Sequence, residues 1–382
     1  MVVSSPEYAE LFFKTHDTVF ASRPKLQIIQ CIWYGQKGVI FLCTIELLSS
    51  SKIEAFKSMR VEEVLKILKS IKSASESQSM IDVSAKVQSL LENMTYRMIF
   101  GFKDDRFSSI KPTIQEALEL VGAFNVADCI PWLRAFDLQG LHRDFIDVML
   151  SLMASDNTRD IHLDQENMNA ILLDDIIAAA MDTKSMSIEW IITELVRHPG
   201  VMKLVQEELE TIVGLDRLVE ETDLIKLSYL KIVIMESMRL HPSAPLLLPH
   251  ESTEDITING YLIPKESRVV INTYAIGRDT KVWSSNAEEF YPERFSGTNI
   301  DVQGHDFQLL PFGSGRRKCL GIQLAMVVAQ LVHCFNLELS NGMSPDDLDI
   351  TEKFGATLPR ANHLMAMASY RLLYFVTVVG QR

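Results

Sequence analysis

A run of three consecutive helical segments constrains the fold more than any other part of this sequence. The first covers roughly Gln165–Arg197 and ends at the tripeptide His-Pro-Gly, because proline and glycine interrupt a helix. The second has Pro199 near its start and Gly214 just after its end, which is the usual arrangement of a capped helix. The third covers roughly Leu227–Leu240 and stops before Pro242. A chain with this run is expected to be mainly helical.

Further helical patterns occur on both sides of the run. Ser5 followed by Pro6 predicts a capped helix at the start, and apolar residues recur with helical spacing over about Ser50–Tyr96, over Pro112–Phe124 and from Phe145 onward. No internal repeat or flexible linker divides the sequence. We therefore expect a single domain over residues 1–382.

A smaller β portion follows the third helix. In the stretch DITINGYLIP, apolar and polar residues alternate on both sides of Asn259 and Gly260, a pair that favours a tight hairpin turn. SRVVINTYAIG predicts a further strand, and GIQLAMVVAQLVHCF predicts a final helix. The predicted fold class is mainly α with a smaller β portion.

Composition excludes several classes of protein. The net charge of −13 argues against a nucleic-acid binder, which needs a basic face. The five cysteines are odd in number and form no C-x-x-C pair, so we expect a reducing compartment rather than a disulfide scaffold. The start shows no secretory leader, and no run reaches the roughly eighteen apolar residues of a membrane span.

The loop PFGSGRRKCLG, Pro311–Gly321, holds one cysteine among glycines and cations. Arg316, Arg317 and Lys318 precede Cys319, and a helix is expected after it. Cations and a helix N-terminus both stabilise a thiolate, the form of cysteine that acts as nucleophile or metal ligand. The alternative is a buried structural cysteine in a turn, which is the ordinary role of a lone cysteine.

Other chemistries do not fit the spacing of this loop. The phosphate-binding pattern GxxxxGK[ST] is absent, and a dinucleotide pattern GxGxxG meets Lys318 where it needs glycine. A Cx5R phosphatase pattern meets Ala325 where it needs arginine. No partner cysteines or histidines lie at zinc-ligand spacing, and the HExxH-like stretch at His250 ends in Glu254.

The pattern F-x-x-G-x-R-x-C-x-G, formed by Phe312, Gly315, Arg317, Cys319 and Gly321, resembles the haem-thiolate loop of the cytochrome P-450 family. The resemblance implies haem b as cofactor, with Cys319 as the axial ligand of the iron. It also implies that Arg317 meets a haem propionate and that Phe312 packs near the sulfur. A thiolate ligand pushes electron density onto the iron.

Two more segments resemble family motifs in the expected order. Glu236 and Arg239 match E-x-x-R on one helix face, and FYPERF matches the element that supplies Arg294. The resemblance implies a buried network of these three residues. The alternative for a Glu–Arg pair at this spacing is a surface ion pair of little energetic importance.

The stretch AAAMDTKS resembles the oxygen-activation motif of the family. The resemblance implies that Asp182 and Thr183 relay protons, and that Ala179 and Ala180 leave room for dioxygen. The alternative is a core threonine bonded to a carbonyl of its own helix, beside a solvated aspartate.

The resemblance, closest to plant microsomal members, implies a monooxygenase that hydroxylates a small hydrophobic metabolite. The resemblance also implies two partners, dioxygen and an NADPH-dependent reductase. Arg316 and Lys318 either help to dock the acidic surface of the reductase or are merely solvated. The implied location is the cytosolic face of the endoplasmic reticulum membrane, or the cytosol for a chain without an anchor. Implied pocket residues are small or apolar: Ala179, Ala244, Leu246, Leu247, Ala356 and Thr357.

The sequence also departs from the family pattern. The N-terminal anchor and a helix with W-x-x-x-R are missing, and a second shortening lies near Arg143. His250 stands where many members have a propionate-binding arginine, and histidine still donates a hydrogen bond. The fold is thus expected to be incomplete at the N-terminus. The alternative function is a catalytically inactive remnant that acts as a haem-binding or interaction protein.

Overall fold

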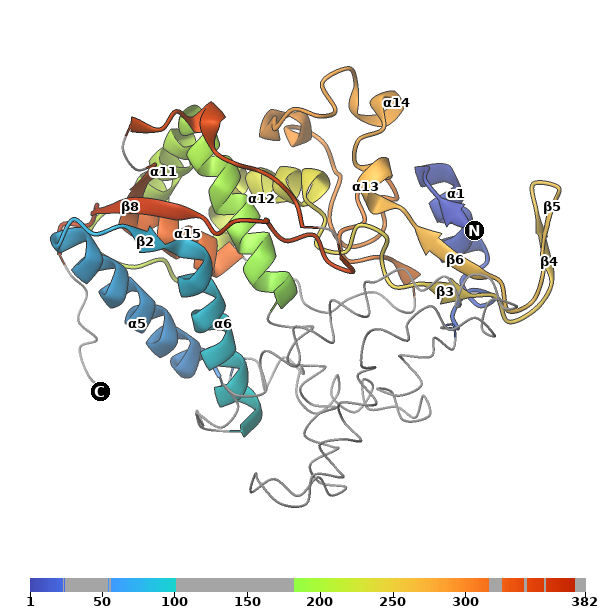
Figure 1. Cartoon of the computed structure of the whole chain (residues 1–382), viewed down its shortest axis with the longest axis horizontal. Coiled ribbons are helices and arrows are strands. Elements are labelled where there is room, and N and C mark those ends of the chain that lie inside the picture. Colours follow the sequence, from blue (N-terminus) through green and yellow to red (C-terminus); the bar gives the residue numbers. More distant parts are fainter. Residues whose placement is uncertain are drawn as a thin grey trace, which may run out of the picture.

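The computed structural model describes residues 1–22, 24, 54, 56–100, 182–315, 325–339, 342–353 and 355–374. These residues form a helical body and a smaller β region, which lie at opposite ends of the molecule (Figure 1). The expectation of a mainly helical protein with a smaller β portion is confirmed. The helix predicted over Pro112–Phe124 and the helical pattern predicted from Phe145 onward, as far as residue 181, lie outside the described residues.

The helical body is built from amphipathic helices that share one apolar core. Its helices are α5 (Lys57–Glu76), α6 (Val83–Phe100), residues 182–197, α11 (Pro199–Val213), α12 (Ser228–Leu240) and α15 (Ala325–Cys334). We call residues 182–197 the relay helix. Both α11 and α12 pack against α15, and the buried core runs from α5 through the relay helix to α15. The described part of the three-helix run predicted from the sequence therefore contributes to this core.

Local capping chemistry explains where these helices begin and end. Ser5 caps α1 (Pro6–Glu10) by accepting from the Tyr8 amide, as predicted. Pro199 is the first residue of α11, and Gly214 ends it with a φ of +85°. The carboxylate of Glu208 on α11 accepts the first amides of α12, so a tertiary contact replaces a local cap there.

The β region joins the start of the chain to the segment after α12. Strand β6 (Arg268–Ile271) pairs in parallel with β1 (Val2–Val3) and antiparallel with β3 (His250–Glu251). Strands β4 (Ile256–Ile258) and β5 (Tyr261–Ile263) form the predicted hairpin, and both turn residues have positive φ. The strand predicted in SRVVINTYAIG ends at Ile271, because Asn272 caps the short helix α13 (Thr273–Ile276).

A second sheet, which was not predicted from the sequence, lies on the helical body. Strand β8 (Met365–Tyr370) pairs with β2 (Ile81–Asp82) and with β7 (Phe335–Glu338), both antiparallel. The two residues of β2 interrupt the helical stretch predicted over Ser50–Tyr96. The remaining short elements are a π-helix at Leu11–Thr15, α14 at Thr280–Trp283, and 3-10 helices at Leu224–Lys226, Pro292–Phe295 and Pro345–Asp347.

None of the helices within the described ranges combines the length and apolar character that a bilayer span requires.

Candidate active site

The predicted proton-relay residues open the described part of the relay helix. Asp182 and Thr183 are both half-buried. The Thr183 carbonyl accepts a hydrogen bond of 2.8 Å from the Ser187 hydroxyl, and the Asp182 carbonyl accepts one of 3.0 Å from Ser185. The neighbouring Ala179 lies outside the described residues. Hydroxyl groups one turn further along the helix therefore hold the backbone of Asp182 and Thr183.

Ser243 joins three segments that the sequence assigned to the pocket. Its hydroxyl lies 2.6 Å from the Ser187 hydroxyl and 3.4 Å from the Thr183 carbonyl oxygen. Its own carbonyl accepts from the Leu358 amide at 3.2 Å. Motif matching missed Ser187 and Ser243. The only local signals were a serine four residues after Thr183 and another directly after a His-Pro pair.

The remaining predicted pocket residues differ in how far they face solvent. Ala244 and Leu247 are half-buried, and Leu247 approaches Gly313 in the cysteine loop. Thr357 is half-buried beside Leu358, whereas Leu246 and Ala356 are exposed. Leu247 and Thr357 thus lie next to other predicted site segments, and Leu246 and Ala356 lie at the surface of the described structure.

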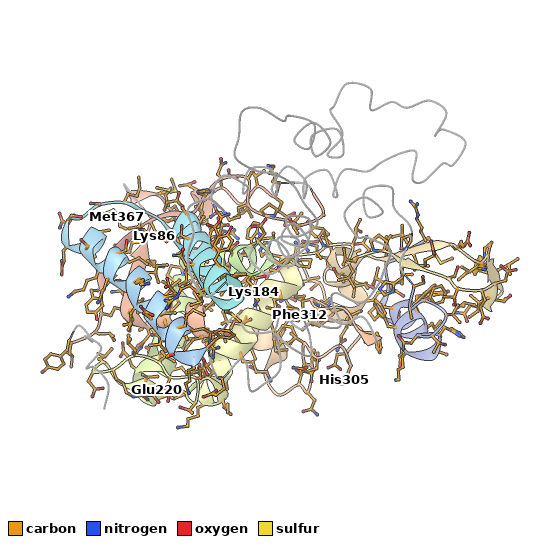
Figure 2. All side chains as sticks on the ribbon, turned by 90° about the horizontal axis from the view of Figure 1, so that it is seen from below. Lys86, Lys184, Glu220, His305, Phe312 and Met367 are labelled. Atoms are coloured by element: carbon orange, nitrogen blue, oxygen red, sulfur yellow. The ribbon has the colours of Figure 1, made fainter. Side chains whose placement is uncertain are left out.

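The first half of the cysteine loop is a tight turn in which two positions require glycine. Gly313 and Gly315 have φ values of +67° and +69°, a region that favours glycine. A Cβ on Gly315 would lie 2.6 Å from the Asp17 carboxylate, and one on Gly304 would lie 2.7 Å from the Gly313 carbonyl. Phe312 packs at the edge of the main core. In Figure 2 the labelled side chains of Lys184 and Phe312 both lie in the central part of the view.

The second half of this loop, with Arg317, Cys319 and Gly321, lies outside the described residues. The donor set is nevertheless fixed by the sequence: one thiol preceded by cations, which is the chemistry of a thiolate ligand to haem iron. The glycine turn that leads into it lets the backbone approach a bound group closely. The loop's composition and its described geometry therefore fit a haem.

His250 has one ring nitrogen committed to the protein backbone. The side chain is buried in β3, and its Nδ1 lies 2.7 Å from the Phe20 carbonyl oxygen. The His250 and Phe13 rings are nearly perpendicular, with their centroids 5.0 Å apart. Because Nδ1–H donates to the carbonyl, Nε2 carries a proton only when the imidazole is charged. A contact between His250 and a carboxylate through Nε2 therefore requires the imidazolium form.

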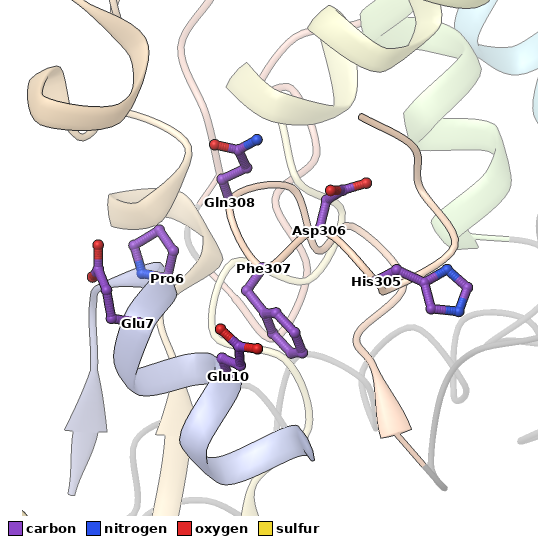
Figure 3. A pocket seen from close by; sticks show the side chains of 7 residues that line it. All are labelled: Pro6, Glu7, Glu10, His305, Asp306, Phe307 and Gln308. Atoms are coloured by element: carbon purple, nitrogen blue, oxygen red, sulfur yellow. The ribbon is translucent and has the colours of Figure 1, made fainter. Parts of the chain in front are cut away.

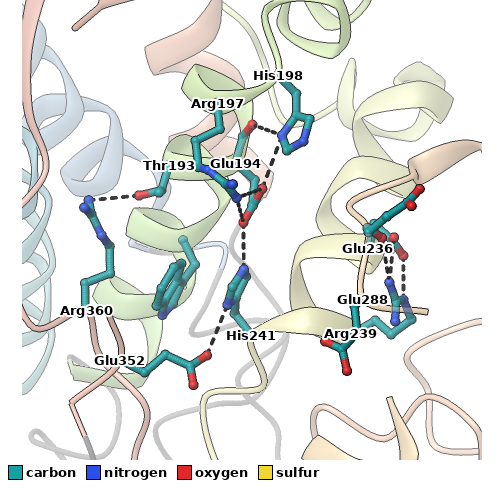
Figure 4. A network of polar contacts seen from close by, with 12 residues as sticks. Thr193, Glu194, Arg197, His198, Glu236, Arg239, His241, Glu288, Glu352 and Arg360 are labelled. Carbon is teal, nitrogen blue, oxygen red and sulfur yellow. Dashed lines mark hydrogen bonds and ion pairs between the residues drawn. The ribbon is translucent and has the colours of Figure 1, made fainter. Parts of the chain in front are cut away.

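Glu236, Arg239 and Arg294 meet in a buried network. The Arg239 guanidinium donates to both carboxylate oxygens of Glu236, at 2.7 Å and 2.8 Å, and Arg294 Nε donates to the same carboxylate at 2.9 Å. Glu236 and Arg239 have almost no exposed surface. Figure 4 shows Arg239 aimed at Glu236 from the same helix. The structure thus places the pair in the interior rather than at the surface.

Both arginines also hold the backbone between α13 and the Pro292–Phe295 turn. Arg239 donates to the carbonyl oxygens of Gly277, Ala287 and Glu289, and Arg294 donates to those of Trp283, Asn286 and Glu289. Leu309, which leads into the cysteine loop, packs with Trp283 and Phe295 of this segment. The network therefore fixes the backbone of the segment against which Leu309 packs, just before the cysteine loop.

A second buried polar cluster lies at the end of the relay helix (Figure 4). The Glu194 carboxylate lies 2.8 Å from His241 Nε2 and 3.2 Å from His198 Nδ1, with Arg197 at 3.3 Å. Burial alone would raise the pKa of Glu194, but hydrogen bonds from the two histidines outweigh it and lower the pKa to about 2. Glu194 in turn raises the pKa of His198. No sequence motif predicted this cluster.

A shallow surface depression of about 260 Å³ lies away from these groups. Figure 3 shows its lining, which comes from α1 and from the loop before the cysteine motif: Pro6, Glu7, Glu10, His305, Asp306, Phe307 and Gln308. None of the predicted site residues lines it.

Comparisons with known proteins identify the family. The family model described as Cytochrome P-450 matches residues 134–366. The chain is 51% identical to the cytochrome P-450 CYP736A12 of Panax ginseng over 97% of this chain and 85% of that protein. It is 35% identical to germacrene A hydroxylase of Barnadesia spinosa, covering 96% of this chain and 82% of that protein.

A solved structure has the same fold. A zebra fish cytochrome P-450, determined with abiraterone, matches with a TM-score of 0.73 at 23% identity, covering 97% of this chain and 93% of that one. The match to the ginseng protein extends over 425 aligned positions, whereas this chain has 382 residues, so that relative contains internal residues that this chain lacks. Similarity over nearly the whole chain does not favour the alternative of an inactive remnant. The chain belongs to the cytochrome P-450 monooxygenase family, with its similar relatives in plants.

Proposed function

We propose that this protein is a haem-thiolate monooxygenase that hydroxylates a small hydrophobic plant metabolite. It uses dioxygen and electrons from an NADPH-dependent reductase, at the cytosolic face of the endoplasmic reticulum membrane. The observation that carries the proposal is the shared contact of Arg239 and Arg294 with Glu236. The E-x-x-R and PERF motifs of the family meet at this contact. The segment that the two arginines hold also packs with Leu309, just before the cysteine loop.

Residues of the cysteine loop and its neighbours would hold haem b. Cys319 would ligate the iron and Arg317 would pair with a propionate, while Gly315 and Gly321 would let the backbone come close. His250 would pair with a propionate in its charged form, because its Nδ1–H is committed to the Phe20 carbonyl. When bound, haem with a thiolate ligand supplies the chemistry that activates dioxygen.

The protein's own groups would deliver protons and position the substrate. The Asp182 carboxyl would take a proton from solvent, and the Thr183 hydroxyl would pass it into the pocket. Ser187 fixes the Thr183 backbone through a 2.8 Å hydrogen bond, so the relay starts from an ordered turn. Ala179, Ala244, Leu247 and Thr357 would line an apolar pocket, which suits a hydrophobic substrate.

Hydroxylation as the reaction type is supported by a relative's name, since one protein similar to this chain is a germacrene A hydroxylase. The test is spectroscopic. Purified protein supplied with haem, reduced and exposed to carbon monoxide should show the red-shifted Soret band of a thiolate ligand. Cys319→Ala should abolish the band, whereas Cys334→Ala, a buried cysteine at the end of α15, should keep it. A wild-type protein without bound haem would overturn the proposal.

A further inference from the structure

Residues 351–353 and 355–361 belong to a small hairpin, and Ala356 and Thr357 lie near its turn. Glu352 and Arg360 form an antiparallel bridge across it. The Lys353 amide donates to the Pro359 carbonyl at 2.8 Å, and the Ala361 amide donates to the Thr351 carbonyl at 2.7 Å. These bonds hold the hairpin together, but they do not determine where it sits on the relay helix.

Trp190 of the relay helix fixes the turn of this hairpin. The indole is 1% exposed, and its Nε1–H donates to the Leu358 carbonyl at 2.9 Å. The Leu358 amide donates in the opposite direction to the Ser243 carbonyl at 3.2 Å. Both backbone groups of the residue after Thr357 are therefore engaged by the walls of the proposed pocket.

His241 connects the same indole to the base of the hairpin. Its ring stacks on Trp190 with a centroid distance of 3.8 Å and an interplanar angle of 1°. Its Nε2 lies 2.8 Å from Glu194 on the relay helix, and its Nδ1 lies 3.5 Å from the Glu352 carboxylate on the hairpin (Figure 4). One imidazole thus touches the helix through one nitrogen and faces the hairpin through the other.

Arg360 also joins the hairpin to the relay helix. Its guanidinium is buried, donates to the Thr193 hydroxyl at 3.2 Å and to the Asp349 carbonyl at 2.6 Å, and lies 5.9 Å from the Trp190 ring centroid. The Glu189 carboxylate lies 4.0 Å from the same guanidinium, so the buried charge of Arg360 has both neutral acceptors and an anion of the relay helix beside it.

We propose that Trp190 and His241 are positioning residues that set the distance of Thr357 from Thr183, and with it the size of ligand that the pocket accepts. The inference rests on the proposed function, because it assumes that these two threonines face one pocket. Neither residue needs to touch the substrate, because both act through the Leu358 backbone and the hairpin's base.

Two variants separate the polar contacts from the packing. Trp190→Phe keeps an aromatic ring and removes the donor to Leu358, and His241→Phe keeps the stack and removes both polar contacts. Leu209→Ala on α11 is the control, since it opens a cavity in the main core far along the chain from the hairpin.

Hydrogen exchange of the whole 382-residue chain tests the positioning without haem. In both Phe variants the amides of Lys353, Leu358 and Ala361 should exchange faster than in wild type, relative to the Val233 amide of α12. In Leu209→Ala the hairpin amides and the Val233 amide should all exchange faster, because the loss of core packing lowers the stability of the whole fold. Equal behaviour of the hairpin amides in wild type and both Phe variants would overturn the inference.

Azole binding tests the consequence in the haem-loaded protein. Imidazole reports access to the iron, and clotrimazole, a bulky azole, also reports the room around it. The Phe variants should weaken clotrimazole binding by about fivefold, the loss expected from one buried hydrogen bond, and leave imidazole binding within about twofold. Parallel changes for both azoles, or no change for either, would contradict the inference. Failure to load haem would defeat the proposed function, whereas the exchange data would still decide the positioning.

Discussion

Glu236 and Arg294 are 58 residues apart in the sequence, yet their side chains meet at 2.9 Å in the interior. The contact links the last turn but one of α12 to the 3-10 turn at Pro292–Phe295. Because Arg239 holds the same carboxylate, one negative charge compensates two buried guanidinium groups that also bind main-chain carbonyls. Neutralising Glu236 therefore leaves two buried cations with an incomplete partner.

Glu236→Gln should lower the free energy of unfolding by about 3 kcal/mol, the usual cost of breaking a buried ion pair from one side. Urea unfolding followed by circular dichroism measures it. Glu288→Gln is the matched control, because Glu288 also pairs with an arginine, Arg278, but is 73% exposed. The control should change stability by less than about 0.5 kcal/mol. Equal losses in the two variants would contradict a special role for the buried network.

Gly277→Ala should destabilise the same region by about 1–3 kcal/mol, because the added methyl would meet the Arg239 carbonyl oxygen, which is rigid backbone. Gly200→Ala in the first turn of α11 is the control, since nothing lies near its Cβ position and alanine favours a helix. The melting temperature of Gly277→Ala should fall, and that of Gly200→Ala should rise or stay unchanged. A Gly277→Ala protein as stable as wild type would show that this contact relaxes freely.

Local chemistry explains which parts of the fold the sequence predicted. Pro199 and Gly214 delimit α11, and Asn259 with Gly260 forms the hairpin turn, because each of these residues restricts its own backbone. The strand at Ile81–Asp82 was missed, since its two residues pair with a strand that begins at Met365. So short a strand has no periodic pattern of its own, and only the distant partner makes it a strand.

The same distinction applies to the candidate site. Glu236, Arg239 and Arg294 were found because their spacing matches a family motif. Ser243 and His241 were not, because a serine or histidine beside a proline has no characteristic pattern. Their importance comes from contacts with Thr183, Glu194 and Leu358, which only the folded chain brings near.

Glu194 should make stability depend on pH in the acid range. Its pKa in the folded protein is about 2, below its ordinary value of 4.5, so its contribution is complete above about pH 4.5 and is lost as the pH falls toward 2. Wild type should exceed Glu194→Gln in stability by roughly 3 kcal/mol at pH 7, and the difference should shrink as the pH drops through that window. Urea unfolding at a series of pH values measures it.

Glu207→Gln is the control for this pH series, because Glu207 pairs with Lys203 at the surface, where both side chains are largely exposed. Its difference from wild type should stay small at every pH. A Glu194→Gln difference that stays constant down to pH 2 would contradict the lowered pKa.

Cys334 should be inert to alkylation in the folded protein. The thiol is fully buried, and burial raises its pKa to about 12, so at pH 8 almost none of it is the reactive thiolate. Iodoacetamide treatment followed by mass spectrometry should leave the Cys334 peptide unmodified in native protein and modify it in urea. Rapid modification of the native protein would mean that the end of α15 opens readily.

Ser187 and Ser243 should be energetically coupled, because their hydroxyls lie 2.6 Å apart and both contact the Thr183 carbonyl. Ser187→Ala and Ser243→Ala should each destabilise the protein, and the double variant should cost less than the sum of the two by about 1 kcal/mol, the net value of one buried hydrogen bond. Ser185→Ala, whose hydroxyl bonds only the Asp182 carbonyl among the contacts described, should combine additively with Ser243→Ala. Additive losses for Ser187 and Ser243 as well would mean that the two hydroxyls act independently, and the relay helix would then not be tied to the segment after His241 through this pair.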